Sequence, residues 1–137
     1  MSIKQTAHDF CEACDAGKGW EVCREWCTPD ATFSVQADAL AEISTLADYT
    51  EWAKGLLTPM PDAHAEFKSL TVDEDASRAI LFAVFHGTHT VDAGNGAPTG
   101  KTVASDYVYV LDFDGGKIRH MTKVWNDVHA LTQVGWM

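Results

Sequence analysis

The sequence lacks any apolar run long enough to cross a membrane. Its longest uninterrupted apolar stretch is the seven residues from Ala79 to Phe85, whereas a membrane-spanning helix needs about 20. The first residues also lack the basic segment followed by an apolar one that marks a secretion signal. These absences predict a cytoplasmic protein with no membrane partner.

Basic residues are scarce, and so are the motifs that bind phosphate groups. Lys and Arg number 10 against 20 Asp and Glu, a net charge of −10, which repels nucleic acid backbones. The chain has no phosphate-binding glycine loop, no strand–GxGxxG–helix unit and no nucleophile elbow. We therefore expect no nucleic-acid partner and no cofactor.

Repeats, low-complexity tracts and linkers are also absent. The 137 residues are 46% hydrophobic and 22% charged, which is typical of one globular domain. We therefore predict a single domain over residues 1–137.

The residue patterns place helices before strands. Apolar residues three and four apart predict helices over 3–15, 20–27 and 48–56, and a last helical turn over 126–134. Alternation predicts strands over 31–35, 63–72, 78–91, 103–113 and 117–125, with a hairpin signal at Asp114-Gly115-Gly116. This order predicts an α+β fold. About three N-terminal helices would pack against a strongly bent, mostly antiparallel sheet that forms a cone-shaped barrel.

Several short segments carry a resemblance to a known family. They are Cys27-Thr28-Pro29-Asp30-Ala31, Gly87-Thr88-His89 with Pro98-Thr99-Gly100, Gly116-Lys117-Ile118-Arg119, Trp125-Asn126-Asp127 and Leu131-Thr132-Gln133-Val134-Gly135. In order and spacing they resemble the SnoaL-like polyketide cyclases, within the wider superfamily resembling nuclear transport factor 2. The resemblance implies a homodimer joined through the outer face of the sheet. It leaves open a cyclase, an isomerase, a hydrolase or a binding module.

The resemblance also implies where catalytic groups would lie. These cyclases use a carboxylate late in the last strand, with a histidine on the preceding strand. Aligned from Gly116, the carboxylate position falls on Lys123; aligned from Trp125, it falls on Val124; the histidine position falls on Tyr109. Neither catalytic group is present, so the family's acid/base pair is not expected here. Asp127 is the nearest carboxylate, and we interpret it as a cap for the last helix.

Alternation and a symmetric hairpin predict one pocket wall. If Asp114-Gly115-Gly116 is a three-residue loop, the numbers of any two facing residues add up to 230. Tyr107 then lies opposite Lys123, and Tyr109 lies opposite Met121. The predicted pocket residues are Phe33, Tyr49, Trp52, Phe85, Tyr107, Tyr109, Met121 and Trp125. A lysine desolvated among them could act as a base or an amine nucleophile. The alternative is that Lys123 extends along the apolar surface to reach solvent.

The opposite face offers a second candidate, because the same reasoning places His86 opposite Asp106. Such a dyad can move protons near neutral pH. The alternative is a structural pair at a dimer interface.

All four cysteines lie within seventeen residues, as Cys11-x2-Cys14 and Cys23-x3-Cys27. This spacing resembles a four-thiolate zinc site. Each cysteine nevertheless falls on the apolar face of its predicted helix, which is typical of buried thiols. We therefore interpret them as reduced core residues and predict no metal.

Two functions remain open from the sequence. One is a cofactor-independent cyclase, isomerase or hydrolase that acts on a small hydrophobic molecule, with Lys123, Asp106 or His86 as acid or base. The other is a dimeric module that binds such a ligand without chemistry. A titratable group with a shifted pKa inside the cavity would favour the enzyme, and a cavity with only hydroxyl groups would favour the binding module.

Overall fold

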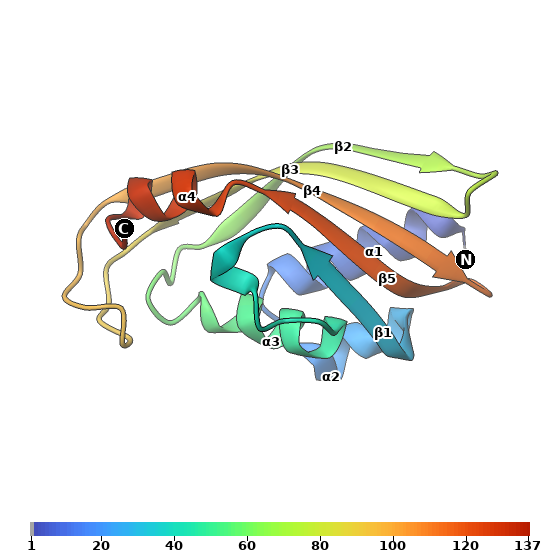
Figure 1. The fold of residues 1–137 in the computed structure, drawn as a ribbon, viewed down its shortest axis with the longest axis horizontal. Coiled ribbons are helices and arrows are strands. Elements are labelled where there is room, and N and C mark those ends of the chain that lie inside the picture. Colours follow the sequence, from blue (N-terminus) through green and yellow to red (C-terminus); the bar gives the residue numbers. More distant parts are fainter. Residues whose placement is uncertain (1) are drawn as a thin grey trace.

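The computed structural model describes residues 2–137 and contains four helices and five strands (Figure 1). The helices are α1 (Ile3–Asp15), α2 (Trp20–Cys23), α3 (Leu46–Gly55) and α4 (Asp127–Val134), with short 3-10 turns η1 (Arg24–Trp26) and η2 (Asp38–Leu40). The strands are β1 (Cys27–Val35), β2 (His64–Asp73), β3 (Arg78–Thr88), β4 (Thr102–Asp114) and β5 (Lys117–Trp125). The predicted order of elements is confirmed. The largest differences in bounds are that α2 ends at Cys23 and is followed by η1, that Cys27 opens β1 instead of ending a helix, and that β3 stops at Thr88 instead of residue 91.

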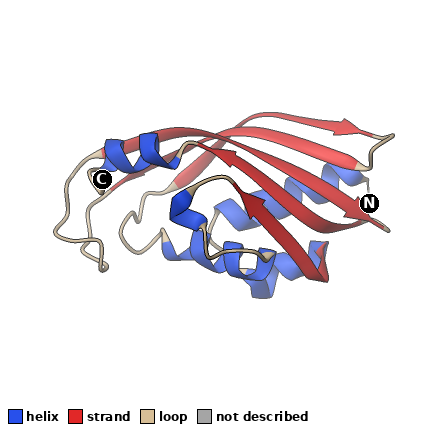
Figure 2. Ribbon diagram, viewed as in Figure 1, coloured by secondary structure: helices blue, strands red, loops and turns tan. Residues whose placement is uncertain are grey.

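The five strands form one bent sheet in the order β1-β5-β4-β3-β2. β1 runs parallel to β5, and the other neighbours are antiparallel. The helices α1, α2 and α3 lie together on the concave side, whereas α4 lies at one end of the sheet (Figure 2). The predicted α+β cone-like fold is thus confirmed, with an open sheet instead of a closed barrel.

The predicted register between β4 and β5 is wrong by two residues. Tyr107 pairs with Trp125 and Tyr109 with Lys123. The hairpin loop is only Gly115-Gly116, because Asp114 pairs directly with Lys117, and a bulge follows between Asp112 and Phe113. Both glycines have positive φ, as the common two-residue hairpin turn requires. Because the total offset is even, every side chain stays on its predicted face.

The core lies between the helices and the concave face of the sheet. Phe10, Leu81, Leu111 and Ile118 are fully buried there. The four cysteines are buried free thiols in the same cluster. Cys11, Cys14 and Cys23 lie on helices as predicted, whereas Cys27 is the first residue of β1. Over residues 2–137, no helix combines the length and apolarity that a membrane crossing requires.

Candidate functional site

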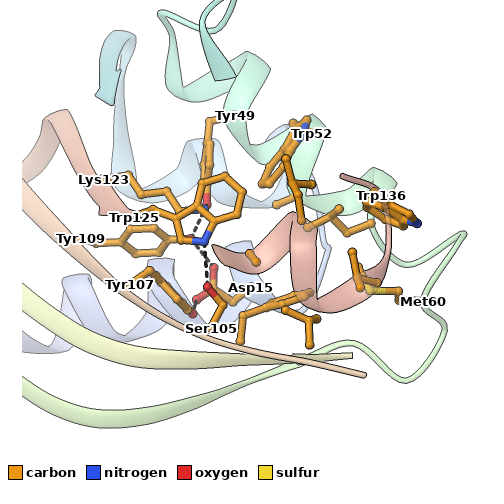
Figure 3. A pocket seen from close by; sticks show the side chains of 17 residues that line it. Asp15, Tyr49, Trp52, Met60, Ser105, Tyr107, Tyr109, Lys123, Trp125 and Trp136 are labelled. Atoms are coloured by element: carbon orange, nitrogen blue, oxygen red, sulfur yellow. Dashed lines mark hydrogen bonds between the residues drawn. The ribbon is translucent and has the colours of Figure 1, made fainter. Parts of the chain in front are cut away.

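A cavity opens between α3, α4 and the concave face of β4 and β5 (Figure 3). Its empty space is about 650 Å³ when the open mouth is counted. Six of the predicted pocket residues line it together with Lys123: Tyr49, Trp52, Phe85, Tyr107, Tyr109 and Trp125. The remaining lining is mostly apolar: Ala53, Leu56, Met60, Val103, Ala130, Leu131, Val134 and Trp136, with Asp15 and Ser105 as further polar members.

Two predicted pocket residues lie behind the wall instead of in it. Phe33 is buried and stacks on Tyr49, with ring centroids 4.5 Å apart. Met121 is fully buried and pairs with Leu111. The predicted partner was Tyr109, two residues earlier on β4, and the register offset accounts for the difference. Both residues support the cavity without lining it.

Asp15 is the functional candidate that the sequence reasoning missed. It is the last residue of α1, and its carboxylate accepts hydrogen bonds from Tyr107 Oη at 2.5 Å and Tyr109 Oη at 2.7 Å (Figure 3). In the sequence prediction, Asp15 lies only at the end of the helix over 3–15 and has no role. A signal was present, because Asp15 continues the inward row of Ala7 and Cys11 at steps of four residues.

Lys123 is buried at the same end of the cavity, with 6% of its surface exposed. Its Nζ donates a hydrogen bond to Tyr49 Oη at 3.0 Å. The same nitrogen lies 4.2 Å from the ring centroid of Trp125 and 5.0 Å from that of Trp52, so it sits inside an aromatic cage. Among residues 2–137, no carboxylate lies within 4.0 Å of Nζ as an ion-pair partner.

The hydroxyl groups join the lysine and the aspartate into one directed relay. Each tyrosine hydroxyl carries one proton, and Tyr109 uses its proton on Asp15. Tyr49 must therefore donate to Tyr109 across their 2.5 Å contact, and its oxygen accepts from Lys123. Protons along this chain all point from the ammonium toward the carboxylate. Their concerted transfer would leave a neutral amine at one end and a neutral acid at the other.

Burial shifts the pKa of both ends toward neutrality. Desolvation raises the pKa of Asp15, against the hydrogen bonds from Tyr107 and Tyr109 and the charge of Lys123. Desolvation lowers the pKa of Lys123 to about 8, against the negative charge of Asp15. Burial also raises the pKa of Tyr49 and Tyr109 well above 10, so both hydroxyls stay protonated as donors at neutral pH.

Further polar contacts fix the walls and the mouth of the cavity. Trp125 Nε1 donates to Ser105 Oγ at 3.0 Å, which leaves the serine hydroxyl proton free to reach a ligand. At the mouth, Trp136 Nε1 donates to Nδ1 of the fully buried His89 at 3.1 Å. His89 in turn donates from Nε2 to the carbonyl oxygen of Val91 at 2.9 Å. These bonds hold both indole rings in fixed orientations.

The predicted dyad of His86 and Asp106 is wrong. Both residues are on the opposite face, as predicted, but the register is again two residues off, so His86 pairs with Ala104 and Asp106 with Val84. Asp106 is exposed. His86 Nε2 lies 3.0 Å from Glu66 Oε1 on the neighbouring strand β2, a partner that the reasoning did not consider.

Asp127 has the kind of contacts expected of it, although it is not the cap itself. Its carboxylate accepts from the backbone N–H groups of Val128 at 3.0 Å and of Ala39 at 2.9 Å. The N-cap of α4 is Asn126, whose side chain accepts from the N–H of His129. Asp127 therefore ties α4 to the segment after β1 and takes no part in the cavity.

Comparison with known proteins identifies the family. The model of the SnoaL-like polyketide cyclases matches residues 5–134. The chain belongs to this family. No curated protein matches it in sequence.

Similar solved structures share the fold of this SnoaL-like protein. IdmH of Streptomyces antibioticus, provisionally called a polyketide cyclase, is 22% identical with a TM-score of 0.77, over 98% of this chain and 99% of that one. AclR of Streptomyces galilaeus, provisionally called a hydroxylase, is 23% identical with a TM-score of 0.74, over 99% and 84% of the two chains. A protein of Acidithiobacillus ferrooxidans, provisionally called a polyketide cyclase, is 19% identical with a TM-score of 0.75, over 98% of both chains.

Proposed function

We propose that this SnoaL-like protein is a cofactor-independent enzyme of the cyclase or isomerase class. It moves a proton at a carbon next to the carbonyl group of a small apolar molecule. The observation that carries the proposal is the relay that joins Asp15 and Lys123 at one end of an otherwise apolar cavity. Two titratable groups with opposed pKa shifts in one cleft are typical of acid/base sites.

Asp15 is the base in this scheme. Each carboxylate oxygen accepts one tyrosine hydroxyl, and further lone pairs remain for a substrate proton. Burial raises the pKa of Asp15 toward neutral pH, and a higher pKa makes the carboxylate a stronger base. Deprotonation next to a carbonyl group creates negative charge on the carbonyl oxygen. The Lys123 ammonium and the free Ser105 hydroxyl are the donors available to stabilise that oxygen.

The walls favour a small hydrophobic substrate. Apart from the relay and Ser105, the lining is aliphatic and aromatic, as in most small-molecule sites. An apolar body held by Trp52 and Trp125 would exclude water from the reacting carbon, so the charges of Asp15 and Lys123 would act at low dielectric.

Solvent exchange tests the proposal. A panel of small aryl ketones and cyclic enones is incubated with the protein in D2O, and deuterium at the carbon next to the carbonyl is followed by NMR. Asp15→Asn should slow the exchange by about a hundredfold or more, the usual worth of a general base. Asp106→Asn, an exposed aspartate on the opposite face, is the matched control and should leave the rate unchanged. Exchange that is unaffected by Asp15→Asn would overturn the assignment.

A non-catalytic binding module is the second candidate. The hydrogen bonds of the relay favour it, because Asp15, Tyr49 and Tyr109 already bond to one another without a ligand. In the same panel, a compound that quenches tryptophan fluorescence at saturation but gains no deuterium supports this reading.

We also propose that two copies of the chain pair through the convex face of the sheet. Phe82 and Val124 on that face expose 39% and 58% of their surfaces. Val108 and Val110 between them are only partly buried. An apolar stripe of this kind is typical of an interface, and a second copy would present the same stripe in return.

A further inference from the structure

We propose that Lys123 is also a covalent site, whose amine condenses with a small aldehyde in the cavity to form an imine. This goes beyond the proposed proton transfer and does not require Asp15 to act as a base. The ligand class is an aldehyde with a short aliphatic or flat aromatic body.

The surroundings of Nζ distinguish Lys123 from the other lysines. An ammonium group has three N–H donors, but within the described residues Nζ has a single hydrogen-bond partner, Tyr49. Lys54 and Lys68, by contrast, are exposed to water. A buried ammonium that satisfies only part of its donors gains by losing a proton, and the resulting amine has a free lone pair.

The state of the amine depends on the groups that face it. They are Asp15 and Cys14 from α1, Tyr49 from α3, and Tyr107 and Tyr109 from β4. With a pKa of about 8, roughly one Lys123 in ten is neutral at pH 7, against fewer than about one in a thousand for an ordinary lysine. The tyrosine relay also offers an internal path for the departing proton.

The condensation balances without an added reagent. The neutral amine attacks the carbonyl carbon, so an N–C bond forms, the C=O π bond breaks and the oxygen takes a proton as nitrogen releases one. The resulting carbinolamine loses its hydroxyl group as water after a second proton moves from nitrogen to that oxygen, and the C=N bond forms. The relay between Tyr49 and Asp15 can carry these protons, and the net products are the imine and one water.

The aromatic cage suits an uncharged imine. Condensation replaces the buried ammonium by a neutral C=N group, and the ring centroids of Trp125, Trp52, Tyr49 and Tyr107 lie 4.2–5.4 Å from the nitrogen. The flat C=N group can therefore pack against aromatic faces without a desolvated charge. The apolar lining beyond the cage matches the body of the aldehyde.

Reductive trapping tests this site. The protein is incubated at pH 7 with propanal or benzaldehyde and sodium cyanoborohydride, which reduces the C=N bond to a stable secondary amine. Peptide mapping by mass spectrometry then compares the labelled fraction at each lysine. Lys123 should be labelled at least tenfold more than Lys54 or Lys68, because its neutral fraction at pH 7 is about a hundredfold larger or more. The preference should disappear in urea, where all lysines are alike.

Two variants control the assignment. Lys123→Met should lose the fast-labelled peptide while circular dichroism shows an intact fold, and Lys54→Met should keep it. Labelling of Lys123 at or below the level of Lys54 by both aldehydes would overturn the proposal. Trapping in Asp15→Asn separates the two functions: a retained Lys123 label together with lost deuterium exchange supports both assignments. A wild-type label without any exchange supports the covalent site and overturns only the proton transfer.

Discussion

Replacing Lys123 by methionine should stabilise the protein at neutral pH, although it removes a buried hydrogen bond. Burial lowers the pKa of Lys123 from its ordinary value of 10.5 to about 8. At about 1.4 kcal/mol for each tenfold change in proton affinity, the buried charge costs about 3 kcal/mol of folding free energy. The variant also loses the hydrogen bond to Tyr49, which costs it about 1 kcal/mol of folding free energy. Lys123→Met should therefore gain about 2 kcal/mol at pH 7.

The gain has a defined dependence on pH. Below pH 8 the lysine is protonated in both the folded and the unfolded chain, so the full cost is present. Between about 8 and 10.5 the unfolded chain still holds the proton that the folded chain has released, so the wild-type protein becomes more stable as pH rises. The advantage of the methionine variant should therefore shrink across that interval.

Urea unfolding followed by tryptophan fluorescence measures this difference. Both proteins are unfolded in reducing buffer at pH 7, 8, 9 and 10, and the two free energies are subtracted at each pH. Groups that titrate alike in both proteins cancel in the difference. A variant less stable than wild type at pH 7, or a difference that is constant over this range, would refute the assignment of a desolvated ammonium to Lys123.

Three further outcomes are expected. Tyr107→Phe removes a hydrogen bond that lowers the pKa of Asp15, so the acid limb of the deuterium-exchange profile should move to higher pH; an unmoved limb contradicts the role of Asp15. Val124→Asp places a charge on the exposed convex face and should convert the proposed dimer to monomer in light scattering, whereas a wild-type protein that is already monomeric at micromolar concentration refutes the dimer. Burial raises the pKa of Cys27 to about 12, so iodoacetamide at pH 8 should alkylate the buried thiols only after urea is added; rapid alkylation of Cys27 without urea speaks against its burial.

The faces of the sheet could be predicted from the sequence, because alternation depends on each strand alone. Tyr107 and Tyr109 share the concave wall whatever their partners are, and the register offset of two residues did not move them. Pairing across strands depends on loop geometry. The two-residue Gly115-Gly116 turn and the bulge beside Phe113 each shifted the pairing by one residue, and no local pattern announced the bulge. The predicted pair of His86 and Asp106 depended on pairing, and it failed.

Asp15 was missed although the helical pattern points it inward, since its role depends on where α1 ends relative to β4. Asp15 is the last residue of α1, and a charged residue at a helix end usually faces water. Here the inward-facing residues of α1 continue through Cys11 to the last turn of the helix. At that turn the hydroxyls of Tyr107 and Tyr109 donate hydrogen bonds to Asp15. Only the tertiary contact reveals that the aspartate is paired. A tyrosine pair on a cavity wall is the sequence feature that calls for such a partner, because buried hydroxyls need one.

The separation of Asp15 from Lys123 matters more than the presence of either. In direct contact, each charge would hold the other ionised, lowering the pKa of the acid and raising that of the amine. Two tyrosine hydroxyls between them weaken this mutual stabilisation while keeping a hydrogen-bonded path. Desolvation then outweighs the remaining attraction at both ends, as the opposed shifts of the two pKa values show. The pKa of the acid is thereby raised and that of the amine lowered, so the two values move toward each other, which a contact ion pair in the same cavity would prevent.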